Sequence, residues 1–256
     1  MKVTLLAHTP DPEITVAMAA KLCYSAATID TIHDGLDEEK TAGFVDMLAQ
    51  IGHESPIEHA SFTFGIEGVS RSLLAQITRH RIASFSVQSQ RYVKEAQFEY
   101  VVPPEIEKDV RAKEIYIKSM ESAQREYDEL ASILAEKHKA DFLASGMEEK
   151  AAARAAEKKA IEDARFVLPN ACTTKMIVTM NARGLLNFFS HRCCNRAQWE
   201  IRELATEMYR LCIRVAPNIF SHAGPPCVRG KCTEGKMSCG KPDEMRKLFA
   251  DMAENK

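Results

Sequence analysis

Residues 76–92 hold four cationic side chains, Arg79, His80, Arg81 and Arg91, and no acidic residue. Neutral hydrogen-bonding side chains lie among them: Ser84, Ser86, Gln88, Ser89 and Gln90. A guanidinium group is permanently charged, and its planar fork matches pairs of oxygens on phosphate or carboxylate groups. The chain must therefore fold so that this stretch meets water or an anion. We expect a site for an anionic ligand such as a nucleotide; surface ion pairs, which contribute little, are the alternative.

The overall charge argues for a small anion as the partner. The chain has 34 basic and 36 acidic residues, whereas proteins that bind nucleic acid or anionic membranes usually carry a basic excess. No stretch approaches the length of a membrane span, and residues 1–10 lack the apolar run of a signal peptide. We therefore expect a cytoplasmic protein with no nucleic-acid or membrane partner, whose eight cysteines are reduced thiols.

Hydrophobic periodicity predicts both strands and helices. The expected strands are 3–7, 62–66, 85–93 and 175–180, and the expected helices are 12–22, 41–50, 70–79, 181–189 and 195–216, with 26–39 irregular. Residues 105–164 read as a helical hairpin divided at Gly146 and inserted into the domain. Its apolar stripe is Tyr116, Met120, Ala123, Tyr127, Leu130 and Leu134. We interpret residues 1–220 as a single domain and 221–256 as a Cys-rich tail.

Capping residues mark several of the expected helix starts. Asp11 precedes a proline, Ser55 and Glu58 have the spacing of a capping box, and Asn195 and Gln198 repeat that spacing. A helix start also presents free N–H groups to an anion. The region around Ser55 is therefore a second candidate for phosphate contacts.

A second polar set lies far from the first along the chain. It consists of Arg165, Asn181, Arg183, Asn187 and Arg192. Asn181 can cap a helix in which Arg183 and Asn187, four residues apart, share one face. Each residue alone is typical of a structural role. Together with the arginines of residues 76–92 they indicate two halves of one polar pocket, which different subunits could supply.

The cysteines and histidines allow a metal site but do not favour one. Cys227, Cys232 and Cys239 with His222 could ligate zinc, yet four and six residues separate the cysteines, unlike the short spacing of a zinc ribbon. His53 and His59 lack the four-residue spacing of a helical zinc pair. We expect no metal.

Several separated blocks resemble the flavin-dependent thymidylate synthases. Arg79-His80-Arg81, seven residues and Ser89 match that family's RHR-x7-S signature. The flanking sequences HESPIEHASFTF, SQRY, ARFVLP, NARGLLNFF and AQWEIRELA agree in the same order. The resemblance implies an α+β subunit with a mainly antiparallel sheet flanked by helices, a homotetramer, and active sites built from several subunits. Residues 1–220 would then be the catalytic domain.

The resemblance also implies a reaction and a set of contacts. NADPH would reduce FAD, and 5,10-methylenetetrahydrofolate would give its one-carbon unit to dUMP, forming dTMP. The implied FAD contacts are His53, Ser55, Arg79, His80, Arg81, Val87, Asn181, Ala182, Arg183 and Asn187. The implied dUMP contacts are Gln76, Ile77, Thr78, Arg79, Val87, Gln88, Ser89, Gln90, Arg91, Arg165 and Arg192.

Individual roles follow from that implied reaction. Arg192 would activate the uracil ring by stabilising negative charge on it, and His53 is a candidate for the folate contact. Val87 departs from family members that carry glutamate or glutamine there, so that polar contact is lost or made by Gln88. Ser89 has no base partner in sequence and is expected to donate a hydrogen bond to substrate, not to act as a nucleophile.

Two rival functions remain open. Arg192 precedes Cys193 and Cys194, and nearby cations can activate a thiol that would add to uracil C6, although a buried structural pair is the simpler interpretation. A nucleotide- or RNA-binding protein with a zinc tail and no chemistry is the other rival. It leaves the ARFVLP and NARGLLNFF matches unexplained.

Overall fold

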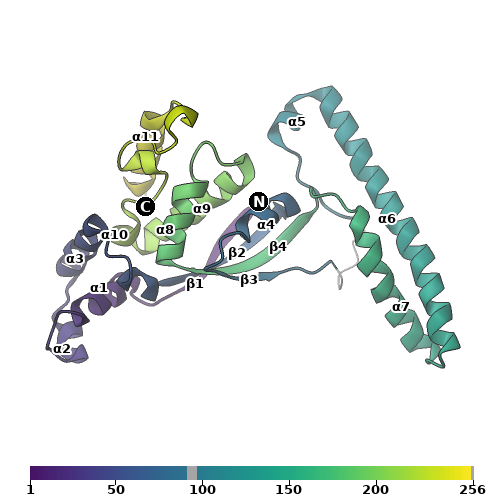
Figure 1. The fold of residues 1–256 in the computed structure, drawn as a ribbon, viewed down its shortest axis with the longest axis horizontal. Coiled ribbons are helices and arrows are strands. Elements are labelled where there is room, and N and C mark those ends of the chain that lie inside the picture. Colours follow the sequence, from purple (N-terminus) through teal and green to yellow (C-terminus); the bar gives the residue numbers. More distant parts are fainter. Residues whose placement is uncertain (91–96, 255–256) are drawn as a thin grey trace. The chain divides into compact units, whose positions relative to one another are not determined.

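The structure, a computed structural model, describes residues 1–90 and 97–254 (Figure 1). The chain divides into two compact units. The first unit contains Met1–Glu67, Ala75–Ser86 and Met176–Lys256, and the second contains Gly68–Leu74 and Val87–Lys175. Arg91, one of the expected dUMP contacts, lies outside the described residues.

A four-stranded sheet has the order β1-β2-β4-β3, formed by Lys2–His8, Ser61–Ser70, Thr173–Asn181 and Ser84–Val87. Strand β1 runs antiparallel to β2, with a register shift between Leu5 and Ala7. Strands β2 and β4 are joined by the Thr63 and Thr179 hydroxyls at 2.9 Å. Three alternate side chains of β2, Phe62, Phe64 and Ile66, are fully buried, as the period of two predicts. The α+β class with an antiparallel sheet flanked by helices is confirmed.

The N-terminal helices are α1 (Pro12–Leu22), α2 (Ile29–Asp34) and α3 (Glu38–Ile51). The expectation that residues 26–39 are irregular is wrong, because α2 and the start of α3 lie there. Thr28 caps α2 by accepting a hydrogen bond from the Thr31 N–H at 3.2 Å. Helix α3 ends at Gly52, whose φ of 72° is the left-handed conformation that glycine adopts without strain. A short 3-10 helix, Pro56–His59, then leads into β2.

Helices α8 (Ala182–Arg192), α9 (Trp199–Val215), α10 (Pro217–Phe220) and α11 (Pro242–Glu254) complete the first unit. An aromatic cluster joins three of them to the sheet. The Phe189 ring lies 5.8 Å from Tyr209 and 5.9 Å from Phe220, which in turn lies 5.4 Å from Phe62. All four side chains are buried, and this core fixes the inner face of α8.

The second unit is dominated by α6 (Val110–Ala144) and α7 (Glu149–Ala164), preceded by α5 (Pro104–Lys108). Figure 1 shows α6 and α7 side by side, and Tyr127, Ala131, Ile161 and Ala164 form the core between them. Leu130, expected in the buried stripe, is instead exposed, because Ala131 takes the inward position. That this pair is an insertion stays a prediction. No helix in the described ranges is long and apolar enough to cross a membrane.

Three expected caps are absent. Asp11 has a left-handed backbone and Ser55 begins a 3-10 helix, and neither side chain accepts a capping hydrogen bond. Helix α9 is capped by Gln198, whose Oε1 accepts from the Glu200 and Ile201 N–H groups at 3.0 and 3.1 Å, and not by Asn195. A glutamine side chain is long enough to fold back on the first turn in this way.

The helix that precedes Arg79-His80-Arg81 is shorter than expected. Helix α4 is Arg71–Ile77, begun by Ser70, whose Oγ accepts from the Leu73 N–H at 3.0 Å. Because the helix ends at Ile77, Gln76 and Arg79 do not share a helical face. Strand β3 ends at Val87, so residues 88–90 of the expected strand 85–93 do not belong to it, and residues 91–93 lie outside the described residues.

Candidate functional site

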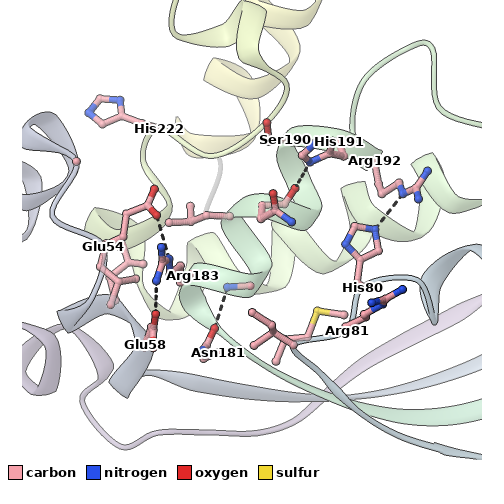
Figure 2. Close-up of a pocket in the computed structure, with 18 of the residues that line it drawn as sticks. Glu54, Glu58, His80, Arg81, Asn181, Arg183, Ser190, His191, Arg192 and His222 are labelled. Atoms are coloured by element: carbon pink, nitrogen blue, oxygen red, sulfur yellow. Dashed lines mark hydrogen bonds and ion pairs between the residues drawn. The ribbon is translucent and has the colours of Figure 1, made fainter.

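A cavity of about 940 Å³ lies entirely within the first unit (Figure 2). Its charged walls are five arginines and two glutamates: Arg79, Arg81, Arg183, Arg192, Arg229, Glu54 and Glu58. Leu48, Ile57, Ile82, Met180, Leu186 and Ile219 supply apolar surface. The two polar sets identified in the sequence therefore meet in part, through residues 79–82 and helix α8.

Helix α8 presents one face to the cavity because of how it begins. The Asn181 Oδ1 accepts from the Gly184 N–H at 2.8 Å, as the expected cap requires. Arg183, Asn187 and His191 then follow at four-residue spacing and line the cavity. A side chain at Gly184 would have its Cβ 3.3 Å from the Ile82 carbonyl oxygen. Glycine at this position therefore allows residues 79–82 to approach helix α8 closely.

Arg183 is already paired with two carboxylates. Its Nε donates to Glu54 at 3.0 Å, and its Nη1 donates to Glu58 (Figure 2). Hydrogen bonds to Glu58 and Glu54 raise the pKa of Arg183 above its ordinary value. Arg183 thus lies in the cavity, as expected, but its charge is balanced by acids that sequence reasoning did not assign to the site.

His80 forms a hydrogen bond with Arg192. The Arg192 Nε donates to the His80 Nε2 at 3.1 Å (Figure 2). His80 Nε2 must therefore be unprotonated, which places the proton of the neutral ring on Nδ1. Burial, reinforced by the charges of Arg192 and His191, lowers the pKa of His80 to about 4. His80 is neutral near pH 7, so its description as a cation was wrong.

This pKa predicts a pH dependence of stability. In the unfolded chain His80 binds a proton below about pH 6.5, whereas in the folded chain it binds one only below about pH 4. The free energy of unfolding should therefore rise as pH increases from 4 to 6.5, because the unfolded state then binds more protons. His80→Gln keeps an acceptor for Arg192 but cannot titrate in this range. We therefore expect the melting temperature of this variant to rise less between pH 4 and 6.5 than that of the wild type. An unchanged profile would contradict the lowered pKa.

The other arginines of the cavity have no acidic partner in the part of the chain that the structure describes. Among residues 1–90 and 97–254, no salt bridge joins Arg79, Arg81, Arg192 or Arg229 to a carboxylate. Burial and then the charge of Arg79 lower the pKa of Arg192, a direction that disfavours its charged form. An anion placed among these groups would relieve that repulsion. The site is thus suited chemically to a phosphorylated ligand with a flat apolar part.

The expected ligand residues fall into three groups. Those that line the cavity are Arg79, His80, Arg81, Asn181, Arg183, Asn187 and Arg192. Those of the first unit that do not line it are His53, Ser55, Gln76, Ile77, Thr78 and Ala182. Ile77 and Ala182 are fully buried, so their side chains belong to the core. The third group belongs to the second unit: Val87, Gln88, Ser89, Gln90 and Arg165.

Contacts within the second unit hold two of its expected ligand residues. The Gln88 N–H donates to the Lys175 carbonyl at 3.0 Å, and the Gln88 carbonyl accepts from Arg71 at 3.1 Å. Arg165 Nε donates to the Glu162 carbonyl at 3.0 Å. This bond uses one edge of the Arg165 guanidinium.

Sequence reasoning missed several residues of the cavity. Glu58 was interpreted as part of a helix cap and Glu54 was given no role, although their four-residue spacing could have indicated a shared partner. His191 hydrogen-bonds the Asn187 carbonyl at 2.8 Å, and His222 hydrogen-bonds Asp46 at 3.1 Å. No local signal in the sequence connects Arg229 with this site.

Comparison with known proteins gives consistent matches. The family model described as "Thymidylate synthase complementing protein" matches residues 4–218. A flavin-dependent thymidylate synthase from Clostridium tetani is 58% identical over 249 residues, 97% of this chain and 97% of that protein. One from Geobacter sulfurreducens is 46% identical over 255 residues, covering 99% and 100%. One from Pyrococcus furiosus is 36% identical, covering 100% and 99%.

Proposed function

This chain belongs to the flavin-dependent thymidylate synthase family, and we propose that the arginine-lined cavity of its first unit binds the flavin and the uracil ring of dUMP. The chain is an FAD-dependent enzyme that methylates dUMP to dTMP. One observation carries the placement: four arginines line the cavity without a carboxylate partner among the described residues.

The residues present fit FAD. Its diphosphate needs cationic donors, which Arg79 and Arg81 offer, and its flat ring needs apolar surface, which Met180 and Leu186 offer. The cavity volume of about 940 Å³ lies near the upper end for ligand pockets, as a large cofactor requires. When bound, FAD supplies the hydride chemistry, while the protein supplies position and electrostatic field. NADPH and 5,10-methylenetetrahydrofolate are the proposed co-substrates.

Arg192 is the proposed catalytic residue. Uracil C5 is a poor nucleophile unless negative charge develops on the ring, and a fixed cation near O2 and N3 would stabilise that charge. The hydrogen bond from Arg192 Nε to neutral His80 supports this role, because it holds the guanidinium while leaving its two Nη groups available. His80 acts here as a positioning residue. It remains neutral and so does not draw the charge away from the substrate.

The phosphate of dUMP is proposed to contact Arg91 and Arg165, with Ser89 and Gln90 donating further hydrogen bonds. These assignments rest on the family resemblance. The same resemblance supports a homotetramer with active sites shared between subunits, in which His53, Ser55, Gln76, Ile77 and Thr78 would complete the ligand contacts. Peptide groups, not side chains, would make the contacts of fully buried Ile77 and Ala182.

A flavin titration tests the placement of the cavity. We expect Arg81→Gln to weaken FAD binding by about 10- to 100-fold, since one charge-assisted hydrogen bond contributes roughly 1.5–3 kcal/mol. Arg214→Gln, an exposed arginine of α9, is the matched control and should bind FAD normally. Equal affinity of both variants would place the flavin elsewhere. A protein that stays colourless after FAD is added would favour the nucleotide-binding rival.

The thiol rival makes a different prediction for Cys193. Burial raises the pKa of Cys193 to about 12, so its thiol is protonated near pH 7 and is a poor nucleophile. We therefore expect Cys193→Ala, alone and combined with Cys194→Ala, to retain turnover within a few-fold in a dTMP-formation assay. Lost turnover in a variant with an unchanged circular dichroism spectrum would restore the thiol mechanism.

A further inference from the structure

The C-terminal tail reaches the cavity of the first unit at two points. His222, which Figure 2 labels, and Arg229 both line the cavity. His222 is held by its hydrogen bond to Asp46 of α3 at 3.1 Å. Both tail residues lie beyond residue 218, where the match to the family model ends. The family resemblance therefore gives neither residue a role, so the role of Arg229 follows from its contacts and surroundings.

Helix α11 anchors this part of the tail to the core of the first unit. Phe249 of α11 is buried, and its ring lies 4.8 Å from the ring of Tyr209 in α9. Gly224, between His222 and Arg229, packs closely on Phe249, because a Cβ at this position would lie 2.7 Å from that ring. The φ of Gly224, 125°, also favours glycine. The chain between the two cavity residues is therefore held against α11.

Arg246 of α11 holds the backbone on both sides of Arg229. Its Nε donates to the Cys227 carbonyl at 3.0 Å, and its Nη2 donates to the Gly230 carbonyl at 3.0 Å. The Nη1 group donates to Asp243 at 2.7 Å. A planar guanidinium can span two carbonyl groups in this way, whereas the ammonium group of lysine is a single point charge. Arg246 therefore fixes the path of the backbone that carries Arg229.

The first two acidic side chains after Arg229 in the sequence are paired with other cations. Glu234 pairs with Arg196 at 3.5 Å, and Asp243 is the acid bound by Arg246. Among residues 1–90 and 97–254, no carboxylate pairs with Arg229, whose side chain is exposed. The guanidinium of Arg229 is thus available to an anion that enters the cavity.

We propose that Arg229, positioned by Arg246, binds an anionic group of a ligand in this cavity. The inference rests on the proposed function, because that reaction supplies the ligands. The group is a phosphate or a carboxylate, whose paired oxygens match the guanidinium fork. Its source is either the diphosphate of FAD or an anionic group of a co-substrate, NADPH or 5,10-methylenetetrahydrofolate. Arg246 is a positioning residue, since it contacts the backbone of the tail and does not line the cavity.

Ligand binding by Arg229→Gln tests the proposal and distinguishes the two sources. A fluorescence titration of flavin-free protein measures the affinity for FAD, and steady-state assays measure KM for NADPH and 5,10-methylenetetrahydrofolate. We expect binding of one of these ligands to weaken by about 5- to 20-fold, because the lost bond is charge-assisted but exposed to solvent. Lys231→Gln is the matched control. It removes the same charge from an exposed tail residue that does not line the cavity, so every ligand should bind as in the wild type.

Arg246→Lys tests the positioning role, because it keeps the charge but cannot span the Cys227 and Gly230 carbonyls. It should weaken binding of the same ligand as Arg229→Gln does. The double variant should bind that ligand no more weakly than Arg229→Gln alone, since both changes remove one and the same contact. Losses that add in the double variant would show that Arg246 acts on the fold independently of Arg229, and would refute the positioning role.

Three results would overturn the proposal: changes of less than about threefold for FAD and both co-substrates, a loss confined to dUMP, or equal losses in Arg229→Gln and Lys231→Gln. Arg81→Gln separates this failure from a failure of the proposed function. If Arg81→Gln weakens FAD binding while Arg229→Gln changes no ligand, only the role of the tail is wrong. If neither variant changes ligand binding, the placement of the flavin is wrong as well.

Discussion

Arg192→Ala is expected to lower the rate of dTMP formation by about 10²- to 10³-fold while FAD remains bound. The physical reason is that the uracil ring must carry negative charge as C5 attacks, and the proposed counter-charge is the guanidinium of Arg192. An interaction made mainly in the transition state should lower kcat and kcat/KM together. Assays of dTMP formation over a range of dUMP concentrations measure kcat and kcat/KM. The flavin absorbance of the same sample shows whether FAD remains bound.

Two controls sharpen this test. Arg192→Lys keeps the charge but loses the planar fork, so it should recover only part of the rate. Arg214→Ala, exposed on α9, should behave as wild type. Removing Arg192 also removes one charge that lowers the pKa of His80, so this pKa should rise in an NMR titration of Arg192→Ala. Turnover within a few-fold of wild type would refute the assigned role.

Phe189→Ala should destabilise the protein by about 3–5 kcal/mol, the usual cost of deleting a buried phenylalanine ring. Phe189 is fully buried, and its ring meets those of Phe188, Tyr209 and Phe220. Loss of the ring would leave a void between α8, α9 and α10. Chemical denaturation of wild type and variant measures the difference, provided that both unfold in one transition.

Phe166→Ala is the matched control for this stability prediction. Phe166 has the same side chain but is 80% exposed, so its removal should change the free energy of unfolding by no more than about 0.5 kcal/mol. Equal losses in the two variants would show that burial of Phe189 does not stabilise the core as proposed.

The local elements could be read from the sequence where the pattern was strong. The alternation at Phe62, Phe64 and Ile66 predicted β2, and Asn181 predicted the start of α8. The predictions failed where a local signal in the sequence is compatible with more than one structure or is too short to recognise. Ser55 has capping chemistry but precedes a 3-10 helix, and Thr28 caps a helix too short to show periodicity.

The candidate site could be read only in part. The arginine pattern and the RHR-x7-S signature identified Arg79, Arg81 and Arg192 as residues of one site. The sequence did not reveal that Arg183 is neutralised by Glu54 and Glu58, which lie 129 and 125 residues away. Charge counted along a stretch says nothing about partners from distant elements.

The sequence by itself determined the family, the strands and helices whose patterns are strong, and which side chains can bind anions. These properties depend on residue type and on neighbours within a few positions. The tertiary structure alone decided that His80 is neutral, because burial and the charge of Arg192 lower its pKa. Arg192, which also donates a hydrogen bond to His80, lies 112 residues away along the chain. The tertiary structure alone also brought Asn195, in the turn after α8, to Cys239 of the tail. Protonation and ligand sets depend on distances in space, and those exist only once the chain has folded.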